Sequence, residues 1–226
     1  MFSAGKARLI TTGASALAAT IALAVALPSS SGAATTSNDS TSFSVTAGSL
    51  AFSTAPGMPT LSAITLNGQA QTTDTTMTNF AVDDATGSGS GWNVTVNGNS
   101  GTGKSPVFKE YCPNSTCGTD SGPGYVSGGQ TLPADSLTLG STGASFTGQN
   151  GTTGTAPTLQ CTTACNVDSA TAVKIVSAAA GAGMGTWASS GWSATSLALS
   201  TPSTLKTLQT GEVYRVDLVW TLNSGP

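Results

Sequence analysis

The sequence predicts an all-β protein that folds as an antiparallel β-sandwich. An immunoglobulin-like architecture is compatible with this prediction. Residues 213–222 have apolar side chains on one face, and polar ones on the other with Val219 as the apolar exception; residues 92–97 alternate in the same way. Gly, Pro, Asn and Asp separate the apolar runs, as turns require. Beyond the first thirty-odd residues only 170–182 has a helix-like composition, and its β-branched side chains and Gly181 favour a strand there too.

The first 33 residues have the three parts of a secretory signal peptide. Lys6 and Arg8 precede an apolar stretch, residues 9–27, and small residues then offer cleavage after Ala33 or Ala34. The alternative is an uncleaved membrane anchor, but the stretch is barely long enough to span a bilayer, and Ser and Thr side chains interrupt it. We therefore expect a secreted protein whose mature form has no integral membrane span.

Cleavage at this site would leave about 190 residues, a length that suits one β-sandwich. We expect a flexible leader over residues 34–40 and a single domain over residues 41–226, with a Gly/Ser/Cys-rich insertion at 98–130 and a second loop-like stretch at 140–154. Short apolar runs predict further strands, at residues 43–45, 50–52, 61–66, 80–82, 137–139 and 197–199.

Charge and composition exclude several classes of function. Charged residues make up only 8% of the chain, against about 25% in an average soluble domain, and there is no histidine. Without Lys6 and Arg8, five basic and ten acidic residues remain, a mature net charge of about −5. So few basic residues cannot form a nucleic-acid surface. The lack of histidine removes the usual general base and the commonest zinc ligand, which disfavours an enzyme.

Residues 98–105 match the phosphate-loop pattern GxxxxGK[ST]. In a nucleotide site Lys104 would bind the terminal phosphates and Ser105 would bind magnesium. Such a site also needs a helix directly after the loop; Pro106 is tolerable at a helix start, but residues 112–114 leave no room for a helix. We therefore predict a hairpin loop and no nucleotide.

The four cysteines form two close pairs in sequence. Because we expect the protein to be exported and the number of cysteines is even, disulfides are favoured over a zinc site. Three pairings are open: crossed bonds would close loops of about fifty residues and stabilise the fold more, whereas proximity favours local bonds. We favour Cys112 with Cys117 and Cys161 with Cys165, and we expect no metal and no cofactor.

Carboxylates do not form an evident catalytic pair. Asp83 and Asp84 are neighbours before a glycine-rich turn, so we expect them to cap that turn, with a calcium ligand as the alternative. Glu110, Asp120 and Asp135 have no spacing that selects a glycosidase pair. A hydrolase that uses only carboxylates is therefore the least favoured function.

The last strand resembles a motif of a known family. Tyr214, Leu218, Trp220, Leu222 and Pro226 match the distal motif YxxxLxWxLxxxP of the WxL-domain family of bacterial cell-surface proteins. The match is specific both in residue type and in its place at the end of the chain.

A second tryptophan strand is similar to the proximal motif of the same family. Asp83 and a glycine-rich turn lead into Gly91 and Trp92, with Val94 where the family usually has leucine. The resemblance covers about residues 41–226. It implies a module on the outer face of Gram-positive-type cells, held non-covalently by peptidoglycan, beside other WxL proteins or partners that carry a WxL-interacting domain.

The tryptophans allow two kinds of role. Trp92 and Trp220 share strand faces with aliphatic residues, so we expect them to pack in the core. Trp187 and Trp192 lie among Gly and Ser, which makes them the better candidates of the four for exposed rings that stack on sugars; core packing is the alternative. The favoured function is a non-enzymatic cell-wall-binding protein; the alternative is a structural or adhesive coat component that assembles with itself or a partner.

Overall fold

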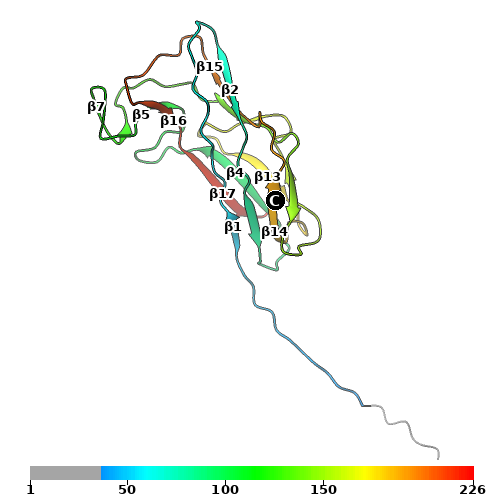
Figure 1. Cartoon of the computed structure of the whole chain (residues 1–226). Coiled ribbons are helices and arrows are strands. Elements are labelled where there is room, and N and C mark those ends of the chain that lie inside the picture. The colour runs from blue at the N-terminus through cyan, green and yellow to red at the C-terminus, as the bar shows by residue number, and fades with distance from the viewer. Residues whose placement is uncertain (1–36) are drawn as a thin grey trace, which may run out of the picture. The chain divides into compact units, whose positions relative to one another are not determined.

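The computed structural model describes residues 37–226, and every regular element within them is a β-strand (Figure 1). The predicted signal peptide lies outside the described residues. Of the predicted leader, residues 37–40 are described, and they are exposed and have no regular structure. No helix of the described part is long and apolar enough to cross a membrane.

Two four-stranded antiparallel sheets form the predicted β-sandwich. The first has the order β1 (Leu50–Thr54), β3 (Ala81–Asp84), β14 (Gly185–Ser190), β10 (Ser145–Gly148). The second has the order β11 (Thr158–Leu159), β13 (Val173–Ala178), β4 (Trp92–Gly98), β17 (Leu218–Ser224). β1 lies beside β17, and β10 lies beside β11, so the edges of one sheet meet the edges of the other.

Three smaller groups of strands lie at one end of this sandwich (Figure 1). One sheet has the order β12 (Cys165–Asn166), β9 (Leu137–Leu139), β15 (Leu197–Thr201), β2 (Gln71–Thr75). Another has the order β16 (Val213–Arg215), β5 (Lys109–Cys112), β8 (Gly124–Tyr125), and β6 (Thr116–Cys117) pairs with β7 (Asp120–Ser121). The Gly/Ser/Cys-rich segment 98–130 thus supplies β5 to β8, and of these strands β5 pairs with β16 from the C-terminal part of the chain.

Aromatic rings from both sheets meet at the centre of the sandwich. Phe80 lies within 6.5 Å, between ring centroids, of four other rings: Phe52, Phe146, Trp192 and Trp220. Trp220 comes from the second sheet, Phe52 and Phe146 come from strands of the first, and Trp192 follows β14, so these contacts join the two sheets. The pairs with Phe52 and Phe146 are edge-to-face, an arrangement that adds to the free energy gained by burying the rings.

Trp92 occupies the core next to this cluster. It is fully buried with Val94 and Val96, because β4 lies between β13 and β17 and turns the same face inward at every second residue. The indole N–H of Trp92 donates to the carbonyl of Gly183 at 3.0 Å. Gly183 has a φ of +73°, and a Cβ there would lie 2.7 Å from the indole nitrogen, so only glycine fits against this ring.

Several predicted strands are confirmed and two are wrong. The runs at 50–52, 80–82, 137–139 and 197–199 form or overlap strands, and residues 173–178 form a strand rather than a helix. The runs at 43–45 and 61–66 are not strands in the structure, because no neighbouring backbone forms hydrogen bonds with theirs. The sequence also missed β2, whose side chains are all polar, and β10, which lies inside the predicted loop 140–154.

The predicted C-terminal strand 213–222 is interrupted. Its backbone leaves β5 after Arg215 and joins β4 from Leu218. At the break, Asp217 donates its N–H to Ser105 at 2.9 Å and accepts from the N–H of Asn99 at 2.7 Å. The apolar face of the motif still packs against the core on both sides of the break.

The two disulfides have the local pairing that we favoured. Cys112 and Cys117 are bonded with a Cα–Cα distance of 5.7 Å, and Cys161 and Cys165 with one of 5.4 Å. All four cysteines of the sequence are therefore paired.

The buried position of Trp92 predicts a large loss of stability on truncation. We expect Trp92→Ala to lower the free energy of unfolding by about 3–5 kcal/mol, because it removes a fully buried ring and leaves a cavity. Trp220→Ala should cost less, since its ring is only partly buried. Urea denaturation measures both, with the exposed Met184→Ala as a control within about 0.5 kcal/mol of wild type. Equal stability of Trp92→Ala and wild type would contradict this packing.

The disulfides predict that the exported protein has no reactive thiol. Alkylation before reduction should add no label, and alkylation after reduction should label four cysteines by intact mass. Peptide mapping should give the pairs Cys112–Cys117 and Cys161–Cys165. Labelling of the native protein, or a peptide that joins the two pairs, would contradict the observed connectivity.

Candidate functional site

The structure brings the two tryptophan motifs together on adjacent strands. β4 and β17 pair along their whole lengths, so that Leu222 lies opposite Val94 and Trp220 opposite Val96. Their apolar side chains point into the sandwich. The alternate residues of both strands therefore form an outer surface.

This outer surface is mostly polar; Val219, opposite Asn97, is the apolar exception on β17. Residues opposite one another in an antiparallel pair point to the same side, which gives two rows of polar side chains. We call the following residues the polar face: Thr158, Ser177, Asn93 and Asn223 in one row, and Lys174, Thr95 and Thr221 in the other. Lys174 is its only charged member.

Hydrogen bonds order the amides of the polar face. The side-chain amide of Asn223 donates to the amide oxygen of Asn93 at 3.2 Å, and the amide of Asn93 donates to the carbonyl of Gly225 at 2.7 Å. The hydroxyl of Thr158 donates to the carbonyl of Ser177 at 3.1 Å. These bonds hold the groups at fixed positions, as a binding surface requires.

A line of hydroxyl groups extends from β3 toward the end of β17. Thr86 donates to the carboxylate of Asp84 at 2.6 Å, and its hydroxyl lies 2.9 Å from that of Ser88. The line continues to Ser90 at 3.0 Å and to Ser224 at 3.4 Å. We call Thr86, Ser88, Ser90 and Ser224 the hydroxyl ladder. It connects the glycine-rich turn of the proximal motif with the end of the distal motif.

The glycines of this turn account for the positions of the hydroxyls in the ladder. Gly87, Gly89 and Gly91 have φ angles of +65°, +61° and +76°, a conformation that favours glycine. Because they alternate with Thr86, Ser88 and Ser90, the three hydroxyls lie within hydrogen-bond distance of their neighbours along the turn. The alternation of glycine with Ser and Thr was visible in the sequence, but its consequence was not predicted.

Asp84 has the capping role predicted for it. Its carboxylate accepts from the N–H of Thr86 at 3.1 Å, in addition to the hydroxyl bond. Asp83 points to the other side of β3 and accepts from the hydroxyl of Thr186 at 3.1 Å. The two carboxylates therefore do not face each other.

The prediction that Trp187 and Trp192 are exposed is wrong. Their exposed fractions are only 5% and 7%, so neither ring is available for stacking on a sugar. Trp187 lies on β14, an interior strand of the first sheet, and donates its indole N–H to Met184 at 3.0 Å. Trp192 stacks on Phe80. The Gly and Ser residues around these tryptophans therefore do not mark an exposed surface, and Ser189 accepts a hydrogen bond from the indole of Trp192 at 3.3 Å.

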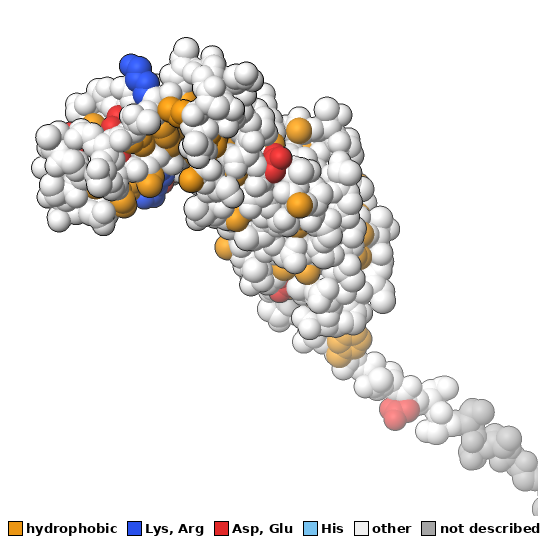
Figure 2. Space-filling view, turned by 45° about the horizontal axis from the view of Figure 1, so that its top comes forward, with side chains coloured by type: hydrophobic (Ala, Val, Ile, Leu, Met, Phe, Trp, Pro, Cys, Tyr) orange, Lys and Arg blue, Asp and Glu red, His pale blue; other side chains and the backbone are white. Residues whose placement is uncertain are grey.

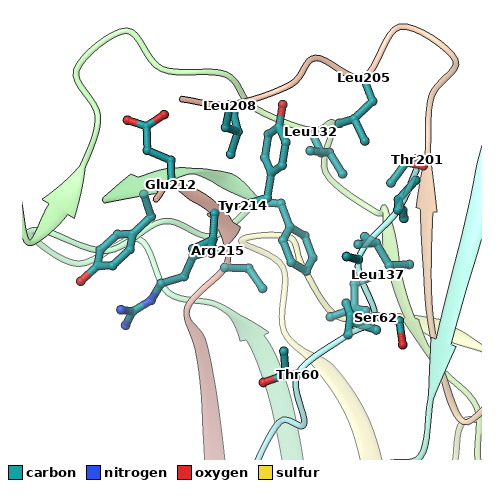
Figure 3. A pocket seen from close by; sticks show the side chains of 18 of the residues that line it. Thr60, Ser62, Leu132, Leu137, Thr201, Leu205, Leu208, Glu212, Tyr214 and Arg215 are labelled. Carbon is teal, nitrogen blue, oxygen red and sulfur yellow. The ribbon is translucent and has the colours of Figure 1, made fainter. Parts of the chain in front are cut away.

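An apolar cleft of about 950 Å³ opens at the end of the sandwich, beside β5 and β16 (Figure 3). One wall is residues 58–66, which we call the strap; the opposite walls come from β9, β15 and β16 and from residues 205–209. Figure 3 shows Leu132, Leu205 and Tyr214 around this space. Aliphatic side chains dominate the lining, so the cleft suits apolar groups better than sugars.

Tyr214 belongs both to the distal motif and to the wall of the cleft. Its ring lines the cleft, and its hydroxyl donates to the carbonyl of Lys206 at 3.0 Å. At the edge of the cleft, burial and the neighbouring carboxyl of Glu110 raise the pKa of Glu212. No sequence pattern pointed to this cleft, because its walls come from four separate segments.

Comparison with known proteins identifies the family. The family model described as "WxL domain surface cell wall-binding" matches residues 28–226, which is most of the chain. The protein belongs to the WxL family. The predicted resemblance is therefore confirmed, and so is a location at the cell surface, where WxL domains bind the cell wall. No curated protein and no solved structure matches the chain.

The phosphate-loop pattern of this WxL domain forms a turn and not a nucleotide site. Residues 98–105 connect β4 to β5, which belong to different sheets, so the predicted hairpin is wrong. As predicted, no helix follows within the described chain. Lys104 lies 3.6 Å from the carboxylate of Asp217, and the hydroxyl of Ser105 donates to the carbonyl of Val107 at 2.7 Å.

Asp217 is the polar centre of the break in the C-terminal strand. Its carboxylate accepts from the hydroxyl of Tyr125 at 2.5 Å, from Arg215 at 2.8 Å and from the N–H of Ser105 at 3.3 Å. Burial raises the pKa of Asp217, but these hydrogen bonds outweigh it and hold the pKa below its usual value. Arg215 in turn lies over the ring of Tyr111, 4.4 Å from its centroid.

These contacts predict a pH-dependent contribution to stability. Asp217→Ala should lower the free energy of unfolding by about 3 kcal/mol at neutral pH, because several donors lose a charged acceptor. Since the folded pKa is depressed, this contribution is present above the usual pKa of Asp and is lost as pH falls through the folded value. Urea denaturation across pH tests the expectation.

Lys104→Ala is the matched control, because its ion pair with the same carboxylate is long and its side chain is exposed. It should change stability by no more than about 0.5 kcal/mol. It should also leave the protein without measurable ATP binding, as in wild type. An effect as large as that of Asp217→Ala would contradict the assignment.

Proposed function

We propose that this WxL protein is a non-enzymatic module that binds peptidoglycan non-covalently through the polar face and the hydroxyl ladder. The observation that carries the proposal is that the two strands with the proximal and distal motifs pair with each other, and that their outward-facing residues form this surface in a protein of a wall-binding family. We also propose that the protein works beside other WxL proteins or partners with a WxL-interacting domain.

The chemistry of the surface suits a glycan. Peptidoglycan sugars present hydroxyl and acetamido groups, which pair with hydroxyls and amides as donors and acceptors. The polar face offers both kinds of group, and the ladder adds hydroxyls beside it. Since the groups are already ordered by hydrogen bonds, binding would immobilise few side chains.

The charge of the protein argues against electrostatic attraction to the wall. Most of the surface seen in Figure 2 is uncharged, with few Lys, Arg, Asp or Glu side chains. Acidic residues outnumber basic ones by ten to seven in the chain. Attraction to acidic wall polymers would therefore be weak, and hydrogen bonds would have to supply the affinity.

We expect the exported protein to sediment with purified peptidoglycan sacculi without degrading them. Binding should survive 0.5 M salt, at which the Debye length is only about 4 Å. Thr221→Val and Ser88→Ala each remove an exposed hydroxyl of the surface and should weaken binding by about 3- to 10-fold. Ser53→Ala, an exposed serine on β1, is the matched control and should bind like wild type.

Three results would contradict the proposal. The first is no sedimentation of wild type with sacculi at any salt concentration. The second is equal binding by Thr221→Val, Ser88→Ala and Ser53→Ala, which would remove the polar face and the ladder from the site. The third is release of soluble sugar fragments, which would show an enzyme.

A further inference from the structure

Residues 41–47 have the sequence of a strand and no strand partner. Phe43 and Val45 alternate with Ser and Thr, a pattern typical of a strand with one apolar face. Their exposed fractions, 89% and 81%, are the highest of any large hydrophobic residue in the described chain. Within residues 37–226, no hydrogen bond involves the backbone of 41–47; the first is from Gly48 to Ala85 at 2.8 Å.

The strap beside the apolar cleft likewise lacks a neighbouring strand to pair with its backbone. The sequence predicts a strand at 61–66, yet residues 55–70 make no backbone–backbone hydrogen bond in the described part of the chain. In the described structure, the backbone of residues 61–66 is bound only by side chains of β2. Thr73 donates to the carbonyl of Ser62 at 3.4 Å, and Gln71 donates to that of Thr65 at 3.0 Å. The strap thus has backbone groups available for an added strand.

A charge before residues 41–47 also matches one on the wall of the cleft opposite the strap, where Lys206 lies; Glu212 and Arg215 are the other charged residues of the lining. Asp39 lies four residues before Phe43 and is exposed. Lys206 lines the cleft, and within residues 37–226 it forms no ion pair. An extended chain from Asp39 to Phe43 covers about 13 Å, which would let the carboxylate meet a cation at the edge while the ring is buried inside.

We propose that residues 41–47 of one molecule bind as a strand along the strap of a second molecule and bury Phe43 and Val45 in its apolar cleft. The added strand would supply hydrogen bonds to the strap, and the two side chains would supply the hydrophobic contacts. Donor segment and acceptor cleft are different surfaces, so the contact is head-to-tail and can continue from molecule to molecule. This goes beyond wall binding and stands independently of it.

The occupant is a second copy because the segment cannot reach its own cleft. Gly48 is bonded to Ala85, next to the end of β3, and in Figure 1 the start of β1 lies at the opposite end of the sandwich from β5 and β16. Phe43 extends at most about 17 Å from Gly48, whereas β17 alone, with seven residues, spans about 24 Å along that direction.

The first test is the oligomeric state of the exported protein by analytical ultracentrifugation. Wild type should associate as its concentration rises. Phe43→Ser with Val45→Ser, the donor variant, should raise the dissociation constant by about 10- to 100-fold for each side chain. Met184→Ser is the matched control: it removes an exposed hydrophobic side chain outside the cleft and should assemble like wild type.

The decisive test mixes two defective proteins. Leu66→Asp, the acceptor variant, places a charge at an exposed position of the cleft, where it should leave folding intact, as a thermal melt would verify. Each variant alone should be monomeric. Mixed together, they should form a dimer and nothing larger, because an intact segment of the acceptor variant meets an intact cleft of the donor variant.

Charge reversal tests the register of the added strand. Lys206→Glu should weaken assembly, and Asp39→Lys in the same chain should restore it. If either substitution acted only by disturbing the fold, the second one would not restore assembly. Lys206→Glu keeps the contact with Tyr214, because the Tyr214 hydroxyl binds the carbonyl of Lys206 and not its side chain.

Four outcomes would overturn the proposal. Wild type could remain monomeric at about 1 mM, where even a millimolar interface would be half occupied. The mixture of donor and acceptor variants could stay monomeric although wild type assembles. Phe43 could be protected from solvent in the monomer, which would show that the segment occupies a site on its own molecule. Finally, Leu66→Asp could abolish sacculus binding and leave assembly unchanged, which would make the cleft a wall site.

Discussion

The backbone pairing between β4 and β17 is the interaction on which the rest of the structure depends. It joins residues that are more than a hundred positions apart in the chain and places Leu222 against Val94 and Trp220 against Val96. The same pairing fixes both surfaces of the sheet. Inward-facing side chains complete the core, and outward-facing Asn and Thr side chains form the polar face. Loss of the pairing would therefore remove the core and the candidate site together.

Small residues make this arrangement possible. All four tryptophans belong to or pack against one core, in a chain where only 6% of residues are aromatic. Gly183 lets the ring of Trp92 approach the backbone, and Ser189 accepts a hydrogen bond from the indole of Trp192 at 3.3 Å. A core of few large rings needs small neighbours to reach normal packing density. Gly183 and Ser189 therefore have structural roles in the core.

The molecule presents two surfaces with different chemistry. The polar face and the hydroxyl ladder offer ordered hydrogen-bonding groups and almost no charge, whereas the cleft beside Tyr214 is lined mainly by aliphatic side chains. One surface cannot serve both a glycan and an apolar segment well, because burial of sugar hydroxyls in an apolar cleft leaves them without partners. The separation of the two surfaces is consistent with a wall-bound protein that also contacts other proteins.

The sequence by itself determined the fold class and the family, since each depends on patterns within a few residues: the alternation over 92–97 and the motif from Tyr214 to Pro226. It favoured local disulfides but left three pairings open, between which the structure decided. It did not determine which apolar runs pair: residues 43–45 and 61–66 have strand sequences but no partner, and the polar run 71–75 is a strand because β15 lies beside it. Nor did it determine the burial of Trp187 and Trp192 or the existence of the cleft. These features were decided by the tertiary structure, because strand pairing, burial and cavity walls depend on segments that meet only after the chain has folded.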